Sequence, residues 1–199
     1  MTRSGAPDEQ LGHERSRDLW REKEDGGRAP EARPHCYAST VSGLIEIADS
    51  RPSLPRGEEL AFDLIDLLRL VAPEGPTLAW ATIDLWTQLR EAAPLPNGRR
   101  YGEFEAAIRA APAGVRVSWD ELLALAEAFQ QVIDGVFVAC QAGAPIPSLD
   151  AGLTPQFYAA CAIVLEALDS TLWRVYARDP AVLQRIRAAF HDITEVSIP

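Results

Sequence analysis

The chain has 199 residues, 47% of them apolar, which is enough for one domain with a sizeable core and a tail. Its 19 basic and 29 acidic residues give a formal charge of -10, which repels phosphate backbones and anionic bilayers, so we expect no nucleic-acid partner and no membrane partner. The three cysteines have no CxxC spacing, and neither a signal-peptide core nor a membrane-length apolar run is present. These features predict a cytoplasmic protein. Only one of the 19 basic residues is a lysine, and this preference for arginine indicates a GC-rich bacterial source.

The first 36 residues are predicted to be a flexible charged tail. Residues 1–35 carry seven basic and eight acidic side chains and few large apolar ones, so they cannot bury enough surface to offset the entropy lost on ordering. The folded domain is therefore expected over 37–199.

The first two segments of this domain are both interpreted as helices. Residues 37–49 mix β-branched and small side chains and fit either a strand or a short helix, of which we favour the helix. Residues 57–73 place Leu60, Leu64 and Leu67 at the spacing of one helix face, which predicts an amphipathic helix.

Two more helices are predicted in the middle of the chain. Thr77 is a candidate N-cap for a helix over 77–94, whose apolar stripe includes Ile83, Trp86 and Leu89. Phe104 and Ile108 share a face at i, i+4 and predict a shorter helix that ends before Pro112.

The last three predicted helices start at clear capping signals. Ser118 and Glu121 form a capping-box pattern for a long helix to Gln141, in which Gly135 costs about 1 kcal/mol relative to alanine. Thr154 and Pro155 start a second helix through residue 177, and Asp179 with Pro180 starts the last one. The sequence therefore predicts an all-α protein, an irregular bundle of about five to six helices behind a disordered N-terminal tail.

The catalytic motifs that we considered are incomplete. The chain has no phosphate-binding loop, no GxSxG and no HExxH, and His191 with Glu195 lacks a further histidine in the predicted domain. Cys140 and Cys161 fall on apolar stripes, where cysteine packs as a small hydrophobe. We therefore predict no catalytic residue, no metal and no cofactor.

Glu166 is the one charged residue in the apolar segment FYAACAIVLEAL. A half-buried carboxyl group in such surroundings has a raised pKa and can act as a general acid or base. The alternative, which we favour, is that Glu166 lies at the edge of the apolar stripe and contacts solvent or an arginine.

The densest acidic stripe combines Glu58, Glu59, Asp63 and Asp66 on one helix. It is either a solvated helix face or a surface that binds a basic partner, and Trp80 is a candidate aromatic anchor beside it. We expect a non-catalytic acidic domain that masks a basic protein, for example an immunity protein that neutralises a toxin.

Two other functions remain open on the sequence. One is an enzyme or small-molecule sensor with an interhelical pocket that uses Glu166, Asp134 or His191, with aromatic walls from Trp173 and Tyr158. The other is a structural subunit of an assembly. The sequence does not predict an oligomeric state.

Overall fold

The computed structural model describes residues 43–49, 60–90 and 95–198, all within the compact unit Thr40–Pro199. The tail predicted over 1–36 lies outside the described residues. The strands are β1 Leu44–Ile47, β2 Leu78–Leu89, β3 Val115–Val117, β4 Phe129–Gln141, β5 Ile163–Leu168, β6 Leu172–Ala177 and β7 Ile193–Val196. The helices are α2 Leu64–Val71, α3 Tyr101–Ala110, α4 Trp119–Ala128, α5 Pro155–Ala160 and α6 Pro180–Ala189, with 3-10 turns at Gly75–Thr77 and Pro96–Gly98.

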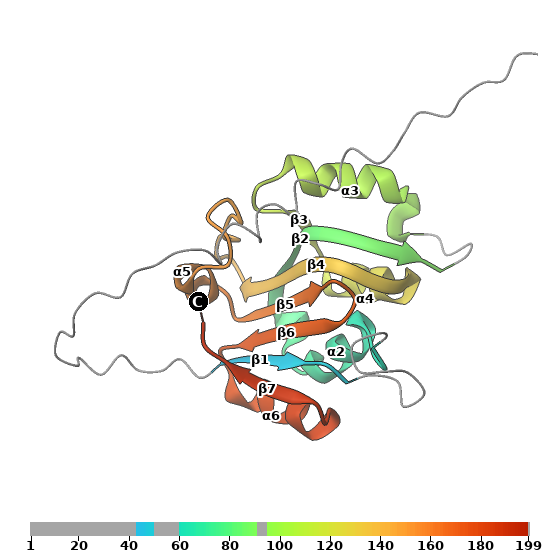
Figure 1. Ribbon diagram of the computed structural model, residues 1–199. Helices are drawn as coiled ribbons and strands as arrows, with labels where there is room; N and C mark the ends of the chain where they lie inside the picture. The colour runs from blue at the N-terminus through green and yellow to red at the C-terminus, as the bar shows by residue number, and fades with distance from the viewer. Residues whose placement is uncertain (1–42, 50–59, 91–94, 199) are drawn as a thin grey trace, which may run out of the picture. The chain divides into compact units, whose positions relative to one another are not determined.

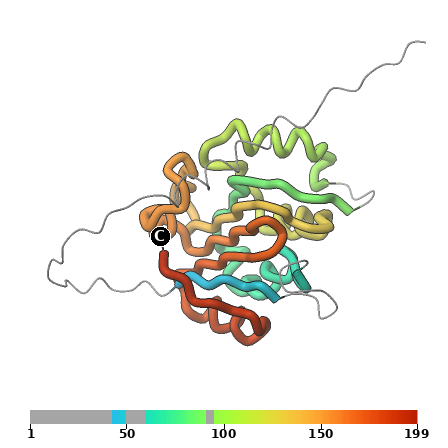
Figure 2. The backbone as a smooth tube through the Cα atoms, viewed as in Figure 1, coloured from blue at the N-terminus to red at the C-terminus, as the bar shows by residue number. Residues whose placement is uncertain are grey.

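Within the described residues the strands form one seven-stranded sheet in the order β3-β2-β4-β5-β6-β1-β7. Every neighbouring pair is antiparallel. The first strand lies between the last two, so both ends of the domain's chain meet in the sheet (Figure 2). The fold is therefore mixed α and β, and the predicted all-α bundle is wrong.

One face of the sheet, called here the helical face, packs against α2, α4 and α6, which lie behind the strands in Figure 1. Trp80 and Trp173 are each 1% exposed on this face. The Trp173 ring stacks on Phe137 with the ring centroids 6.3 Å apart, and the Trp80 indole donates to the Gly75 carbonyl at 2.9 Å. The rest of this core includes Ile45, Ile47, Leu64, Leu67, Leu68, Leu122, Leu125, Leu165, Val175, Leu183 and Ile186.

The opposite face, called the second face, is covered at one end by α5 and the loop before it (Figure 1). A second apolar cluster fills this end and includes Leu44, Val138, Cys140, Leu153, Phe157, Tyr158, Cys161, Val164 and Tyr176. Because the central strands have apolar side chains on both faces, their sequences lack the alternation of apolar and polar residues that identifies a half-buried strand.

This burial on both faces explains the errors at β2 and β4. The predicted helix over 77–94 is the strand β2, and the predicted helix from Ser118 to Gln141 ends at Ala128 and continues as β4. Gly135, which the prediction placed inside that helix, lies in β4, where an added Cβ would meet the Phe137 and Val132 side chains at 3.1 Å.

The other predicted helices that the structure corrects also contain strands. The segment predicted as a helix through residue 177 forms the short helix α5 and then the hairpin of β5 and β6, whose turn places Asp169 and Ser170 at positive φ. Residues 44–47 of the first predicted helix form β1, and the last predicted helix ends at Ala189, before β7. A continuous apolar run does not distinguish a buried helix from a buried strand.

The helix starts, in contrast, are confirmed wherever a capping residue was identified and a helix forms. Ser118 and Glu121 form the predicted capping box, and the side chains of Thr154 and Asp179 accept backbone N–H groups at the starts of α5 and α6. The predicted helix over 57–73 is confirmed in part, since α2 covers Leu64–Val71. In the described part of the chain, no helix has both the length and the apolar character needed to cross a bilayer.

Candidate functional site

The second face carries a line of charged side chains that crosses the sheet. Strand pairing sets Asp84 opposite Val136, Val136 opposite Glu166, Glu166 opposite Arg174, and Arg174 opposite Glu46. Directly opposed residues in antiparallel strands point to the same face, so these side chains form a row over β2, β4, β5, β6 and β1. With strands spaced by about 4.8 Å, the row is roughly 19 Å long.

A bulge in β2 places Asp84 in this row. The register between β2 and β4 shifts between Thr82 and Asp84, so that Thr82 opposes Phe137 on the helical face and Asp84 opposes Val136 on the second face. The Asp84 carboxylate accepts the Leu85 N–H at 2.9 Å, which orients its side chain.

Asp134 adds a further carboxylate next to the row. It opposes Trp86 across the β2 and β4 pair, and its Oδ1 accepts the N–H of Asp169 in the β5–β6 turn at 2.8 Å. The Ser170 N–H donates to the Ile133 carbonyl at 2.8 Å, so β4 holds this turn at two points. We call Asp84, Asp134, Glu166 and Glu46, with Arg174 among them, the acidic row.

Glu166 is the buried centre of the acidic row. Its side chain is 2% exposed, and neither carboxylate oxygen accepts a hydrogen bond from the described residues. The Arg174 guanidinium lies 3.8 Å from Glu166 Oε2, whereas its Nε donates to Glu46 Oε1 at 2.7 Å. Arg174 therefore binds Glu46 and leaves Glu166 without a hydrogen-bond donor, although a buried carboxylate needs one.

The surroundings of Glu166 favour its protonated form. Burial raises the pKa of Glu166 to about 7, with Glu46 and Asp134 adding to the rise and Arg174 opposing it. Burial also raises the pKa of Asp84, which the Leu85 hydrogen bond opposes and the charge of Asp134 reinforces. The row thus concentrates negative charge in a place where the protein solvates it poorly.

The structure places the predicted acidic stripe differently from the sequence interpretation. Asp63 is the N-cap of α2, and its carboxylate accepts the Leu64 and Val132 N–H groups at 2.7 and 3.0 Å. Asp66 completes a capping box by accepting the Asp63 N–H, and it forms an ion pair with Arg69 at 3.2 Å. Glu58 and Glu59 lie outside the described residues, so their predicted role in binding remains a prediction.

Trp80, the predicted anchor, is part of the helical-face core. It is 1% exposed, and its ring lies 5.6 Å from that of Trp119. A partner would have to displace this core to contact the Trp80 indole.

The residues of the enzyme alternative are only partly brought together. Glu166, Asp134 and Tyr158 are close enough to interact electrostatically, and burial and the charge of Glu166 raise the pKa of Tyr158. Trp173 points to the opposite face, and His191 follows α6, where its backbone N–H donates to Asp49. Among the described residues, no three His, Cys, Asp or Glu side chains form a metal-binding group.

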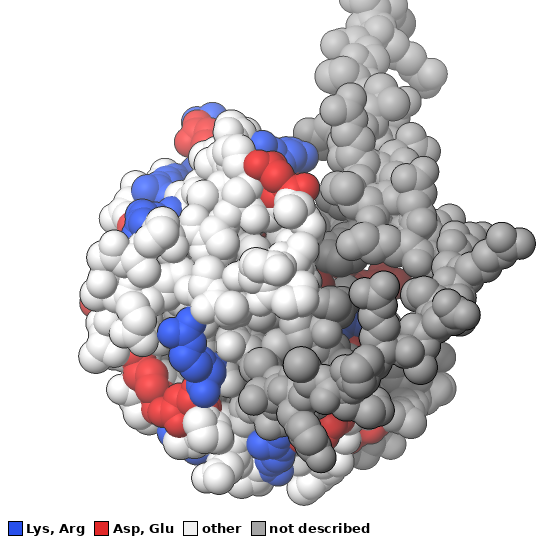
Figure 3. Space-filling view, turned by 90° about the vertical axis from the view of Figure 1, so that its left-hand side faces the viewer, with Lys and Arg blue, Asp and Glu red and all other residues white. Residues whose placement is uncertain are grey.

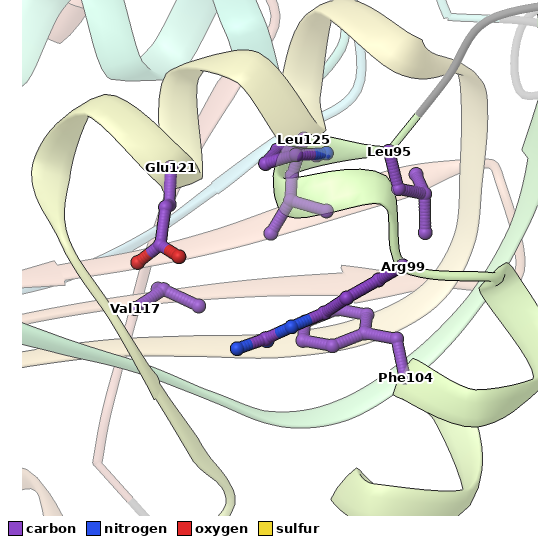
Figure 4. Close-up of a pocket in the computed structure, with 7 residues that line it drawn as sticks. Leu95, Arg99, Phe104, Val117, Glu121 and Leu125 are labelled. Carbon is purple, nitrogen blue, oxygen red and sulfur yellow. The ribbon is translucent and has the colours of Figure 1, made fainter.

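A small pocket lies away from the acidic row, between α3, α4 and the turn before α3 (Figure 4). Its empty volume of about 210 Å³ includes space that is open to solvent. The Arg99 guanidinium lies over the Phe104 ring, 5.9 Å from its centroid, and faces Glu121 across the pocket. The other lining residues are Leu95, Pro96, Val117 and Leu125.

The side of the domain with α5 has few charges. Figure 3 shows isolated charged groups around a broad uncharged area there, and Asp150 is the one charged residue between Gln141 and Glu166 in the sequence. The acidic row on the sheet therefore contrasts with the neighbouring surface formed by 142–160.

Comparison of the chain with family models, with curated proteins and with solved structures gives no match. The function is therefore inferred from the acidic row.

Proposed function

We propose that this protein is a non-catalytic binding protein that recognises and masks a basic protein partner through the acidic row. The observation that carries the proposal is the unequal charge of the row, in which the four carboxylates Glu46, Asp84, Asp134 and Glu166 share one cation of the sheet, Arg174, while Arg109 of α3 acts on Asp84 at the far end. Glu166 in particular has no hydrogen-bond donor among the described residues, so a partner's lysine or arginine that docks beside it at Arg174 and Glu46 would stabilise its charge.

The dimensions of the row suit a segment of polypeptide. A length of roughly 19 Å corresponds to about six residues of an extended chain or about thirteen residues of a helix. The formal charge of -10 adds a long-range attraction that speeds the encounter with a basic surface. A toxin that an acidic immunity protein holds inactive is one example of such a basic partner.

The test compares two variants that remove the same charge from different surfaces. The row variant carries Asp84→Asn, Asp134→Asn and Glu166→Gln, which keep a hydrogen-bond acceptor at each position. The control variant carries Asp120→Asn, Glu127→Gln and Glu195→Gln, at exposed carboxylates outside the row. Each is tagged, expressed in the source organism and used to recover partners, whose binding is then measured with purified components.

The proposal predicts that one basic protein binds the unmodified chain and the control variant alike, and binds the row variant at least tenfold more weakly. Binding should also weaken as salt increases, because the row is partly exposed. Equal binding by the two variants would show that the acidic row is not the recognition surface.

A second candidate function rests on Glu166 alone. A carboxyl group with a pKa of about 7 is suited to general acid–base chemistry, which is the enzyme alternative. A small molecule that raises the melting temperature of the unmodified chain but not that of Glu166→Gln would favour this alternative.

A further inference from the structure

On the premise of the proposed function, we infer that partner binding is coupled to the release of a proton from Glu166. The Glu166 carboxyl group holds this proton in the free protein at mildly acidic pH, and it ionises when a cationic side chain of the partner docks on the acidic row. The proton passes to the solvent buffer, so no other reactant is required.

The free state favours the proton for geometric reasons. The Glu166 side chain is 2% exposed, so water does not solvate its charge. Glu46 and Asp134 face it with like charge from β1 and β4, and Asp84 lies further along the same row on β2. Arg174 on β6 is the cation that acts on Glu166, and its shortest ion pair is with Glu46, whereas Arg109 of α3 acts on Asp84.

The remaining neighbour does not replace the missing cation. Tyr158 of α5 faces Glu166 across the second face, and burial keeps its phenol protonated by raising its pKa. Neither of the two oxygens of Glu166 accepts a hydrogen bond from the described residues. An ionised Glu166 is thus stabilised mainly by a guanidinium that it shares with Glu46.

A docked partner changes this balance. Arg174 and Glu46 are 33% and 23% exposed, so the row is accessible to a partner next to the buried carboxyl group. A cation within about 4 to 6 Å of a carboxylate lowers its pKa by roughly 1 to 3 units. Docking therefore favours the ionised form of Glu166, and the proton leaves.

The linkage has a defined sign. Because the complex binds fewer protons than the free protein, the association constant rises with pH. A group with a pKa of about 7 that ionises fully on binding increases the association constant by about tenfold between pH 6 and pH 8.

The experiment counts the protons by isothermal titration calorimetry. The full-length chain is titrated with an acetylated and amidated peptide of alternating arginine and glycine, which has no group that titrates near pH 7. Runs at pH 6.5 in phosphate and in imidazole, buffers with different ionisation enthalpies, give the number of protons released. We expect about three quarters of a proton at pH 6.5 and about a tenth at pH 8.

Three variants assign the proton to Glu166. Glu166→Gln should release no proton and should bind with an affinity that is flat in pH, with its folding checked by thermal denaturation. Glu195→Gln removes the same charge at a carboxylate that pairs with Arg187, and it should behave as the unmodified chain does. His191→Gln should release the same number of protons as the unmodified chain, because His191 lies in the turn after α6.

The outcomes separate this inference from the proposed function. Binding that releases no proton, or an equal release by Glu166→Gln, overturns the inference and leaves the proposed function standing. Absence of peptide binding at pH 8 overturns both. Binding with a proton that is lost only in Glu166→Gln supports both.

Discussion

The two faces of the sheet use the same strands for different purposes. On β6, Trp173 points to the helical face and stacks on Phe137, whereas its neighbour Arg174 points to the second face and contacts two carboxylates. The helical face contains apolar side chains that α2, α4 and α6 cover. The second face has an apolar cluster beneath α5 and carries the acidic row across the middle of the sheet.

This difference between the two faces separates the residues that stabilise the fold from the residues that we propose bind a partner. Burying apolar surface on the helical face stabilises the fold, whereas an ionised carboxylate at 2% exposure destabilises it. A destabilising arrangement of this kind is typical of functional sites. Truncating a buried apolar side chain on the helical face and removing the charge of Glu166 on the second face should therefore change the free energy of unfolding in opposite directions.

The largest expected effect is on the helical face. Trp173→Ala should lower the free energy of unfolding by about 3 to 5 kcal/mol, because it removes a fully buried ring and leaves a cavity. Urea denaturation measures this loss. Thr194→Ala, at an exposed residue of the second face, serves as the control and should stay within about 0.5 kcal/mol. A loss below about 1 kcal/mol for Trp173→Ala would show that this face does not hold the fold together.

The next effect is a gain on the second face that depends on pH. Folding raises the pKa of Glu166 from 4.5 to about 7, so the contribution of this group is fully present below pH 4.5 and is lost as the pH rises through 7. Glu166→Gln avoids this loss and should be more stable than the unmodified chain at pH 8, by up to about 3 kcal/mol, with little difference at pH 4.

Denaturation curves at pH 4, 6 and 8 measure this difference. Glu195→Gln should show no gain across the same range, because Glu195 is 60% exposed. If Glu166→Gln were less stable than the unmodified chain at pH 8, the ionised carboxylate would be stabilising and the contrast between the faces would fail.

A smaller loss is expected at the start of α2. Asp63→Ala removes the helix cap and leaves the Val132 N–H without its acceptor, which should cost about 1 to 2 kcal/mol. Asp63→Asn keeps a side-chain acceptor and should recover part of this loss in the same denaturation assay. If Asp63→Ala left stability unchanged and weakened partner binding instead, the sequence-based acidic stripe would be the better account.

The smallest effect is expected in the turn that Asp134 holds. Ser170 has a φ of 61°, a conformation that glycine adopts without a steric cost. Ser170→Gly should therefore stabilise the protein by about 0.5 kcal/mol, measured as a small rise in melting temperature. Ser197→Gly, outside the left-handed region, should not produce this rise.

The sequence predicted helix starts well and helix ends poorly. Ser118 and Glu121 form a local pattern that depends on four consecutive residues, and the structure confirms it. The end of α4 at Ala128 depends on β4 being buried between α4 on one face and the second cluster on the other. That burial is a tertiary property, and it removed the alternation that would have identified the strand.

One residue of the candidate site, Glu166, could be identified from the sequence. Glu166 stood out as the one charge in an apolar segment, and Arg174 does lie 3.8 Å from it, but the favoured position at the edge of the stripe is wrong, because the side chain is 2% exposed and burial raises its pKa. The acidic row itself depends on strand register, which joins Glu46, Asp84 and Arg174 from distant parts of the chain. A helical interpretation provides no such register, so it directed attention to the stripe on α2.

The central claim is that a basic partner binds the acidic row. The most direct test is a ¹⁵N NMR titration of the full-length chain with the arginine–glycine peptide at pH 8. The account predicts that the largest chemical-shift changes occur at Glu46, Asp84, Asp134, Glu166 and Arg174, with small changes over α2, α4 and α6. The largest changes at Glu58, Glu59 and the start of α2, or changes spread evenly over the surface, would contradict it.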